Sequence, residues 1–341
     1  MEKTAKIIDG KSKNKNLNPI VIIVFIVLAL YALTLFFVLG WGFITSFKTA
    51  SEFKLRPPRF GGPNVLGLPD IEYNKLVAEA EGRAYNFFEN YYNILKSFPL
   101  DINSAELSYH SAIWGDIQGT GYTAKFGHFV LNSFIYAITG SLLYSLVCLI
   151  TAYLCSKYRY KFSYFMYTML LIIMTIPLVG TQPATIKLLR DLGLYDKYLG
   201  MFVMSANFTG LYFFVYYAFF QGISDTFMEA AEIDGASQFM TLVRIIIPLS
   251  AKMIGTIFLL QFIVLWNNYD VPLLYYPGKP TLAYAIYKMS ENTSGDNKGF
   301  DFQETPQRVA GCMILAIPVL IVFLSLKDVI MGNISLGGIK E

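Results

Sequence analysis

Long apolar stretches alternate with shorter charged ones along this chain. Pro19 to Phe47 contains no charged residue, and a helix of this length, rising about 1.5 Å per residue, can cross the roughly 30 Å hydrocarbon layer of a bilayer. Five further charge-poor stretches follow, at about 129–154, 162–181, 198–221, 253–273 and 309–326. The pattern predicts an all-α, polytopic membrane protein with six transmembrane helices.

The polar segments between these stretches suggest the organisation of the chain. Residues 70–92 have a helical pattern with a Tyr- and Phe-rich face, and 187–197 has that of a short surface helix. The expected parts are an N-terminal tail (1–18), a first transmembrane helix (19–47), an extracellular segment (48–126), a five-helix core (127–326) with a cytoplasmic loop at 222–252, and a C-terminal tail (327–341).

Lysine and arginine positions set the expected orientation. The segment 1–18 is Lys-rich, and Lys157, Arg159 and Lys161 occupy the short turn after the second stretch. Because positive residues gather on the cytoplasmic side, both signals place the N-terminus inside. With six crossings the C-terminus is also cytoplasmic, and 48–126 lies outside. A cleaved signal peptide fits poorly, because the first apolar stretch is longer than the roughly 7 to 15 residues of such a segment.

Composition supports this class. The 341-residue chain is 55% hydrophobic and 15% charged, which leaves too little polar surface for a soluble globule of its size. Its net charge of +3 comes without a basic face or an RNA-binding motif, so no nucleic-acid partner is expected. The three cysteines lie in or at the ends of apolar stretches, without metal-ligand spacing. We find no catalytic cluster, and expect a transport subunit rather than an enzyme.

The segment 229–248 is too polar to span a bilayer and has the pattern of a helix, a turn and a second helix. Ser224 or Asp225 can cap the first helix, and Gly235 is the residue type that ends helices in a left-handed conformation. Ser237 can start the second helix, which Pro248 is expected to end. One apolar face of that helix should be buried, at Phe239, Leu242, Val243, Ile246 and Ile247.

This segment resembles the cytoplasmic EAA loop of binding-protein-dependent ABC importer permeases. The similarity rests on Glu229-Ala230-Ala231, Gly235 and Ile247-Pro248-Leu249. Its surroundings are similar to the carbohydrate branch of the MalG type: 233–237 reads Ile-Asp-Gly-Ala-Ser, 266–268 reads Trp-Asn-Asn and 337–340 reads Gly-Gly-Ile-Lys. The resemblance runs from about residue 129 to the end. It departs before the first helix, where the family usually has Pro and acidic residues and this chain has Ser224, Thr226 and Met228.

The resemblance implies that the loop is a coupling helix held in a cleft of an ATPase subunit. The residues implied to carry the coupling are Phe227, Glu229, Ala230, Ala231, Gly235 and Phe239. Implied partners are a second, MalF-like permease subunit, two copies of the ATPase subunit, an extracellular sugar-binding protein, and a sugar or oligosaccharide. ATP and magnesium would be bound by the ATPase subunit, and no cofactor by this chain. An alternative is an amphipathic helix lying on the membrane surface.

Polar side chains inside the apolar stretches are candidates for the sugar path, because lipid-facing surfaces exclude them. Aromatic rings, amides and carboxylates can stack on and hydrogen-bond to a sugar. Equally, polar groups in spans join helices together, and aromatic residues are common at membrane interfaces. The candidates are Asn207, Gln261, Trp266, Asn267, Asn268, Tyr269 and Asp270.

A secondary transporter or channel that needs no ATPase is the alternative function. Such a protein is expected to carry ion-coupled carboxylates within its spans. Asp270, near the outer end of the fifth stretch, is the one carboxylate available, so the sequence favours an ABC importer of the bacterial cytoplasmic membrane.

Overall fold

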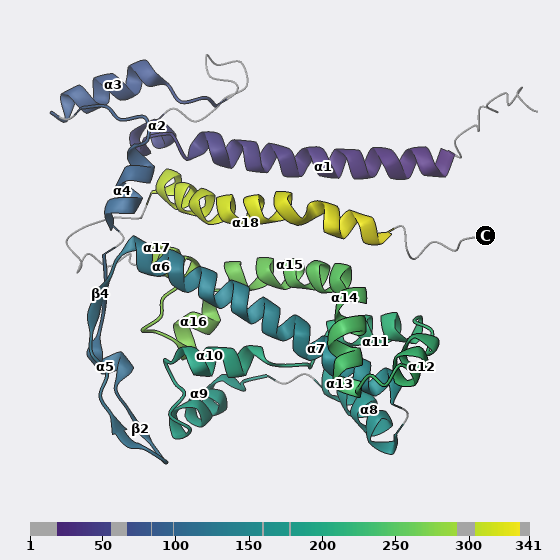
Figure 1. Ribbon diagram of the computed structural model, residues 1–341. Coiled ribbons are helices and arrows are strands. Elements are labelled where there is room, and N and C mark those ends of the chain that lie inside the picture. The colour runs from purple at the N-terminus through teal and green to yellow at the C-terminus, as the bar shows by residue number, and fades with distance from the viewer. Residues whose placement is uncertain are drawn as a thin grey trace, which may run out of the picture.

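The computed structural model describes residues 19–55, 67–82, 84–97, 99–158, 160–176, 179–291 and 304–334. The expectations for the N-terminal lysines, Arg159 and the motif at 337–340 concern residues outside these ranges. The described chain is mainly helical, and its longest helices run side by side between an end rich in short elements and an end formed by α12 and α13 (Figure 1).

Among the described residues, three helices are long and apolar enough to cross a membrane. They are α1 (Pro19–Thr45), the continuous helix Phe126–Lys157, and Thr305–Lys327 of α18 (Thr305–Ile334). The second comprises α6 (Phe126–Phe134), the π-helix η1 (Ile135–Thr139) and α7 (Gly140–Lys157). A fourth candidate is the pair Gln238–Leu249 and Ala251–Asn267, bent by 70°. The chain is therefore a multi-pass membrane protein.

The third and fourth predicted spans are shorter or interrupted. The third contains α8, which covers only Lys161–Thr175. The fourth is not continuous over 198–221, because α10 (Tyr198–Ser205) and α11 (Leu211–Gln221) are separated by residues 206–210. At this break the Asn207 side-chain oxygen accepts hydrogen bonds from the Thr209 amide (2.6 Å) and hydroxyl (2.7 Å). These local bonds compete with the helical ladder, and Gly210 follows at φ 146°.

The fifth predicted span also ends earlier than expected. Helix α15 (Ala251–Asn267) stops at Asn268. The side-chain oxygen of Asn268 accepts a hydrogen bond from the Val271 amide (3.1 Å) in the first turn of α16 (Asp270–Tyr275). The amide side chain thus starts a new helix in place of continuing the old one.

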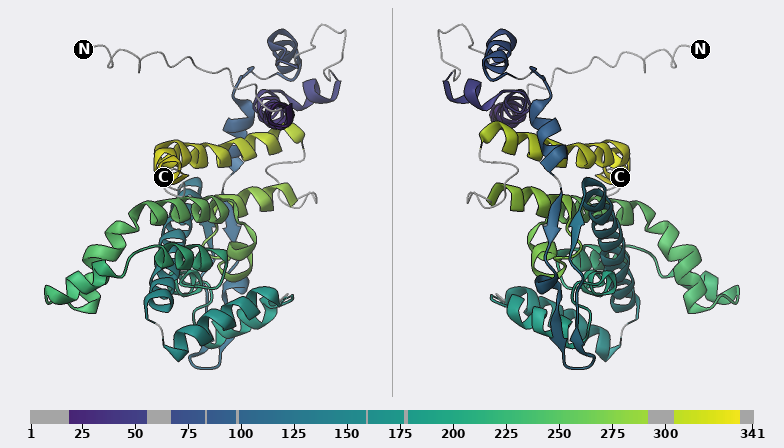
Figure 2. Two further views of the ribbon diagram at one scale, coloured as in Figure 1. Left: turned by 90° about the vertical axis from the view of Figure 1, so that its right-hand side faces the viewer. Right: turned by 90° about the vertical axis from the view of Figure 1, so that its left-hand side faces the viewer.

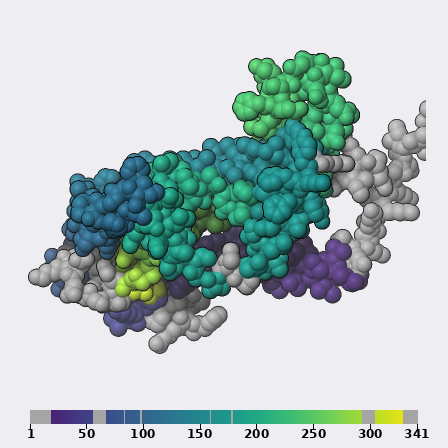
Figure 3. Space-filling view, turned by 90° about the horizontal axis from the view of Figure 1, so that it is seen from below, coloured from purple at the N-terminus to yellow at the C-terminus, as the bar shows by residue number. Residues whose placement is uncertain are grey.

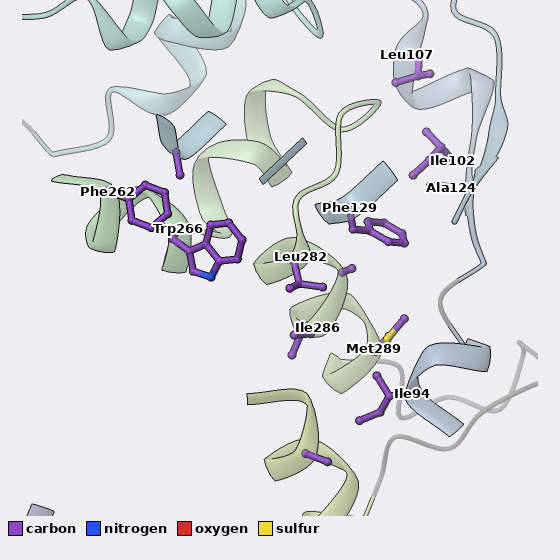
Figure 4. Close-up of a cluster of buried hydrophobic side chains, with 13 residues drawn as sticks. Ile94, Ile102, Leu107, Ala124, Phe129, Phe262, Trp266, Leu282, Ile286 and Met289 are labelled. Atoms are coloured by element: carbon purple, nitrogen blue, oxygen red, sulfur yellow. The ribbon is translucent and has the colours of Figure 1, made fainter. Parts of the chain in front are cut away.

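A cluster of buried apolar side chains joins α6, α15 and α17 (Leu282–Glu291) to α18 and to the segment 48–126 (Figure 4). We call the segment 48–126 the outer segment after its expected position. Trp266 is its largest member, stacked on Phe262 and edge-on to Phe134. The Trp266 indole N–H donates to the Leu315 carbonyl of α18 (2.9 Å). Since a buried indole N–H must be paired, this bond fixes α15 against α18.

A second cluster joins α7 to α11 and to the start of α15. Phe213, Tyr216 and Phe220 of α11 are fully buried in it. At its centre the hydroxyl groups of Ser145 and Tyr216 lie 2.7 Å apart and form a hydrogen bond. Aromatic burial of this extent, with the polar tip satisfied, makes α7 and α11 a closely packed pair.

The outer segment contains strands, so the expectation of an all-α chain is wrong in detail. Strands β1 (Leu100–Ile102) and β4 (Tyr122–Ala124) pair antiparallel, as do β2 (Tyr109–Ser111) and β3 (Gly115–Ile117). The remaining elements there are the short helices α2 (Ala50–Leu55), α3 (Ile71–Ala80), α4 (Glu89–Ser97) and α5 (Ser104–Leu107).

Two further helix expectations change in their bounds. The stretch 70–92 is not one helix, since α3 ends before Gly82, which has a φ of 68°, and α4 begins at Glu89. The surface helix expected at 187–197 is α9 (Gln182–Asp191).

Past α9, Asp196 adopts φ 57° and its carboxylate accepts a hydrogen bond from the Gly278 amide (2.7 Å). Burial raises the pKa of Asp196, while Lys279 and this hydrogen bond oppose the rise.

Asn90 and Tyr91 of α4 attach the outer segment to the end of α1. The Asn90 amide donates to the carbonyls of Ser46 and Lys48, both at 2.8 Å. The Tyr91 and Ser46 hydroxyls lie 2.7 Å apart. Asn90 is only 7% exposed, so water does not replace these bonds when they are lost.

We therefore predict that Asn90→Ala loosens the junction between α1 and α4. Two buried carbonyls would lose their donor, at a cost of about 1 to 3 kcal/mol. Thermal unfolding of the detergent-purified protein should show a lower midpoint. Tyr92→Phe, at a position that is 58% exposed, serves as the control and should leave the midpoint unchanged. An equal midpoint for Asn90→Ala would contradict the role of this contact.

Candidate functional site: a projecting loop and a polar cavity

The polar segment after α11 folds as a helix, a turn and a second helix. Helix α12 (Thr226–Ile233) ends before Gly235, whose φ of 78° confirms the predicted left-handed turn. Ser237 caps α13 (Gln238–Thr241), and its hydroxyl accepts from the Met240 amide (3.3 Å), as the sequence predicts. A π-helix η2 (Leu242–Ile246) and α14 (Ile247–Leu249) continue the second helix. We call residues 226–249 the projecting loop.

The second helix of the projecting loop runs past the expected stop. Pro248 does not end it, because the helical backbone continues through Pro248 to Leu249. The chain bends by 70° between Leu249 and Ala251 instead. The predicted apolar face divides, because Ile246 is fully buried while Phe239 is 74% and Val243 is 43% exposed.

The projecting loop stands away from the rest of the molecule (Figures 2 and 3). Its exposed surface combines apolar and acidic side chains. Phe227 is 50%, Ile233 86% and Phe239 74% exposed. The acidic residues Glu229, Glu232 and Asp234 are also exposed. An exposed apolar patch rimmed by charged residues is typical of a protein-interaction surface. Sequence reasoning missed Ile233, although an isoleucine beside a polar turn was the available signal.

The two alanines of the loop differ in their surroundings. Ala230 is exposed, whereas Ala231 is only 5% exposed. The Ala231 carbonyl accepts from the Ala236 amide (2.9 Å) across the turn. Ala231 therefore packs within this chain, and the expectation that both alanines face a partner is modified. Ala230 is the alanine free to approach another protein.

The start of α12 does not use the predicted side-chain cap on Asp225. Asp225 occupies the cap position but makes no capping hydrogen bond there. Its carboxylate instead accepts from the Lys157 ammonium at 2.7 Å. The Ser224 hydroxyl accepts a hydrogen bond from the Thr226 amide at 3.3 Å. Of the two predicted capping residues, it is therefore the serine that bonds to the first turn of α12.

A small cavity lies beside the break between α10 and α11. Its volume is about 180 Å³, and it brings together Asn207 and Gln261, two of the predicted path residues. The Gln261 side chain forms no hydrogen bond with any other described residue, and Gln261 is half-buried. The other lining residues are Tyr136, Gly140, Tyr144, Met201, Met204, Ser205, Leu265, Val271 and Tyr276.

The five other predicted path residues lie outside this cavity. Trp266 is buried against Phe134 and Phe262. The Asn267 amide donates to the carbonyl of Ile263 on its own helix (2.8 Å).

The Asn268 side chain accepts a hydrogen bond from the Val271 amide at the start of α16, and Asp270 is exposed in the first turn of that helix. Tyr269 stacks on Tyr287 with ring centroids 4.1 Å apart. These residues therefore shape the end of α15 in this chain. No three His, Cys, Asp or Glu side chains of the described ranges lie close enough to hold a metal ion.

Comparison with known proteins places this arrangement in a family. Residues 145–335 match the family described as binding-protein-dependent transport system inner membrane component. A solved bacterial ABC transporter that imports the acidic polysaccharide alginate is similar in structure, with a TM-score of 0.62 and 21% sequence identity, covering 90% of this chain and 95% of that chain. At this identity the likeness shows the fold, an ABC importer permease fold.

Two curated relatives are sn-glycerol-3-phosphate transport system permease proteins UgpE. The one from Pectobacterium atrosepticum is 30% identical over 171 residues, which cover 48% of this chain and 60% of the relative. The one from Escherichia coli strain K12 is 31% identical over 163 residues, covering 48% and 57%. The match thus spans less than two thirds of either relative. Since the family match includes α11, the projecting loop and α15, the chain belongs to the binding-protein-dependent transport system inner membrane components, the permease subunits of ABC importers.

Proposed function

We propose that this chain is the permease subunit of an ATP-driven ABC importer that moves a sugar or oligosaccharide into the cell by alternating access. The projecting loop carries the proposal. It presents Phe227, Ile233 and Phe239 to solvent, in a chain whose family works with partner proteins. In the assembled importer, an ATPase subunit covers this surface and moves it when ATP binds.

The proposed topology has six crossings with both termini in the cytoplasm. Helix α8 and the interrupted pair α10 and α11 supply the third and fourth crossings. A broken helix is tolerated at membrane depth where it borders a polar cavity inside the protein, and Asn207 of the break at 206–210 lines such a cavity. This topology places the projecting loop inside and the strands of 100–124 outside, where a sugar-binding protein docks.

The cavity supports a two-subunit path for the sugar. At about 180 Å³ it is smaller than the roughly 300 to 1,000 Å³ of pockets that enclose a ligand. We infer that this chain forms one wall and a second, MalF-like permease subunit forms the other. Two copies of the ATPase subunit, which hold ATP and magnesium, complete the assembly.

The lining of the cavity favours an uncharged substrate. Within the described chain the lining combines amide, hydroxyl and aromatic groups with Met, Leu and Val side chains, and it includes neither Lys nor Arg. Such groups hydrogen-bond to and stack on a neutral sugar, whereas a phosphate or uronate would call for a cation. A neutral substrate would differ in charge from the glycerol-3-phosphate for which the relatives are named and from the acidic polysaccharide of the alginate importer.

The docking prediction concerns Ala230. Ala230→Asp should place an unpaired carboxylate in a tight interface, at a cost of about 3 kcal/mol or more, which is about a hundred-fold in affinity. Co-purification of the ATPase subunit with the permease should fall sharply while membrane insertion is retained. Ala230→Ser is the matched control and should still co-purify the ATPase.

Ala231→Asp provides the contrast, because Ala231 is 5% exposed within this chain. It should lower the yield and thermal stability of the permease itself. Normal recovery of the ATPase subunit with Ala230→Asp would show that this face of the loop is not the docking surface.

The substrate prediction concerns Gln261. Gln261→Leu keeps a similar size and removes a free amide from the cavity, so sugar uptake should weaken by about two- to ten-fold, the worth of one hydrogen bond. Uptake of radiolabelled sugar by reconstituted vesicles measures this. Gln221→Leu, at an exposed position outside the cavity, should have no effect. Unchanged uptake with Gln261→Leu would show that Gln261 does not contact the sugar and would assign the sugar contacts to the partner subunit.

A further inference from the structure

The cytoplasmic end of α7 holds the projecting loop through a buried lysine. The Lys157 ammonium donates to the Ile223 carbonyl at 2.6 Å and to the Asp225 carboxylate at 2.7 Å. The Lys157 side chain is only 5% exposed, while that of Asp225 is 57% exposed. Ile223 follows the last turn of α11 and Asp225 precedes α12. One ammonium therefore bridges the end of a membrane helix and the start of the loop.

Two tyrosines near Lys157 extend this attachment over the whole loop. The Tyr153 hydroxyl donates to the sulfur of Met228 on α12 (3.3 Å). The Tyr158 hydroxyl donates to the side-chain oxygen of Gln238 on α13. Both helices of the loop are thus fixed to the end of one membrane helix.

Helix α8, which follows in the chain, is placed differently. Its residues Phe162 and Phe165 are 68% and 55% exposed, and Leu170 is its one described residue in the buried class. Among the described residues, no hydrogen bond joins α8 to the projecting loop. The loop is therefore carried by α7 and α11 rather than by α8.

The other end of α7 reaches the polar cavity. Gly140 and Tyr144 line that cavity. The Tyr144 hydroxyl lies 3.5 Å from the Thr209 carbonyl, and the Cys148 sulfur lies 3.7 Å from the Asn207 carbonyl. A Cβ on Gly210 would approach the Tyr144 hydroxyl to 2.6 Å, so α7 fits closely against the broken helix.

The distance between the two contact regions is about 20 Å, from Tyr144 to Lys157 at about 1.5 Å per helical residue. Between them the Ser145–Tyr216 hydrogen bond and the buried aromatic rings of α11 bind the two helices together. Close packing transmits a displacement of one end to the other with little deformation.

We propose that α7 is the rigid strut that links movement of the projecting loop to the break at 206–210, and that Lys157 is the positioning residue that fixes the loop to it. This rests on the proposed function. When the ATPase subunits move the loop, Lys157 makes α7 and α11 follow, and the cavity beside Asn207 changes shape. Without the ammonium, the loop still docks but can tilt on its own.

Lys157→Met tests this, because methionine keeps the apolar stem and removes the charge. Asp225 is largely exposed and can be solvated, so the permease should fold. The complex with its ATPase and a second permease subunit is reconstituted in vesicles with sugar-loaded binding protein. We expect the ATPase subunit to be retained at the parental level, while sugar transported per ATP hydrolysed falls about ten-fold, the effect of losing charged hydrogen bonds.

Three further variants separate positioning from general damage. Lys157→Arg keeps the charge and donors and should retain most of the transport per ATP. Lys161→Met removes an exposed lysine four residues away and should be neutral. Asp225→Asn should also lower transport per ATP, but by a smaller factor than Lys157→Met. The double variant should transport about as poorly as Lys157→Met alone, since both changes act on one contact. If Lys157→Met fails to assemble, transport per ATP is compared between Asp225→Asn and the parental complex instead.

If Lys157→Met transports as much sugar per ATP as the parental protein, the proposed role of α7 is wrong. The same holds for Asp225→Asn if Lys157→Met cannot be assembled. Loss of the ATPase subunit from an otherwise stable Lys157→Met permease would also overturn that role, by showing that Lys157 serves docking. Failure of the proposed function is distinguishable, because the parental complex itself would then show no ATP-driven uptake.

Discussion

Backbone amide and carbonyl groups inside a bilayer must find partners within the protein, because lipid offers none. A long unbroken helix such as α1 meets this requirement by itself. The break between α10 and α11 does not, and polar side chains surround it. Asn207 bonds to Thr209, and Tyr144 and Cys148 of α7 lie against the carbonyls of the break. The most irregular part of the membrane region is thus also the place where we propose the substrate path.

The same requirement explains why α7 is central to the structure. It packs against α11 through the Ser145–Tyr216 pair, contacts the break at one end and holds the projecting loop at the other. In the proposed mechanism, this one helix joins the projecting loop to the cavity, so that movement of the loop changes the shape of the cavity. Helix α8 packs against α11 through Tyr167 and Leu170, but among the described residues it has no hydrogen bond to the projecting loop, and its Phe162 and Phe165 are exposed.

Features governed by neighbouring residues were predictable from the sequence. The turn at Gly235, the cap at Ser237 and the apolar stretches each follow from local chemistry. Features that depend on distant residues were not. Only the fold shows that Ala231 is buried and that Asp225 bonds to Lys157 in place of capping α12. The break at 206–210 had a local signal in Asn207 and Gly210, but apolar residues on both sides gave the pattern of one span.

Strands in the outer segment were missed for a related reason. Each is three residues long, too short for an alternating pattern to stand out. Trp266 shows the opposite error. Its aromatic ring suggested a sugar contact, yet its indole N–H is used to join α15 to α18. A polar aromatic residue in a span can serve packing or ligand binding, and the partner of its polar atom decides between them.

The central claim is that the projecting loop docks on an ATPase subunit. Photo-cross-linking in living cells tests it directly, with a photoreactive amino acid replacing Phe239, which is 74% exposed, and in a second variant Ile246, which is fully buried. The account predicts that the probe at Phe239 forms a covalent adduct with a nucleotide-binding subunit, identified by mass spectrometry, and that the probe at Ile246 does not. Adducts from Phe239 to lipid alone would contradict it and make the loop a membrane-surface helix.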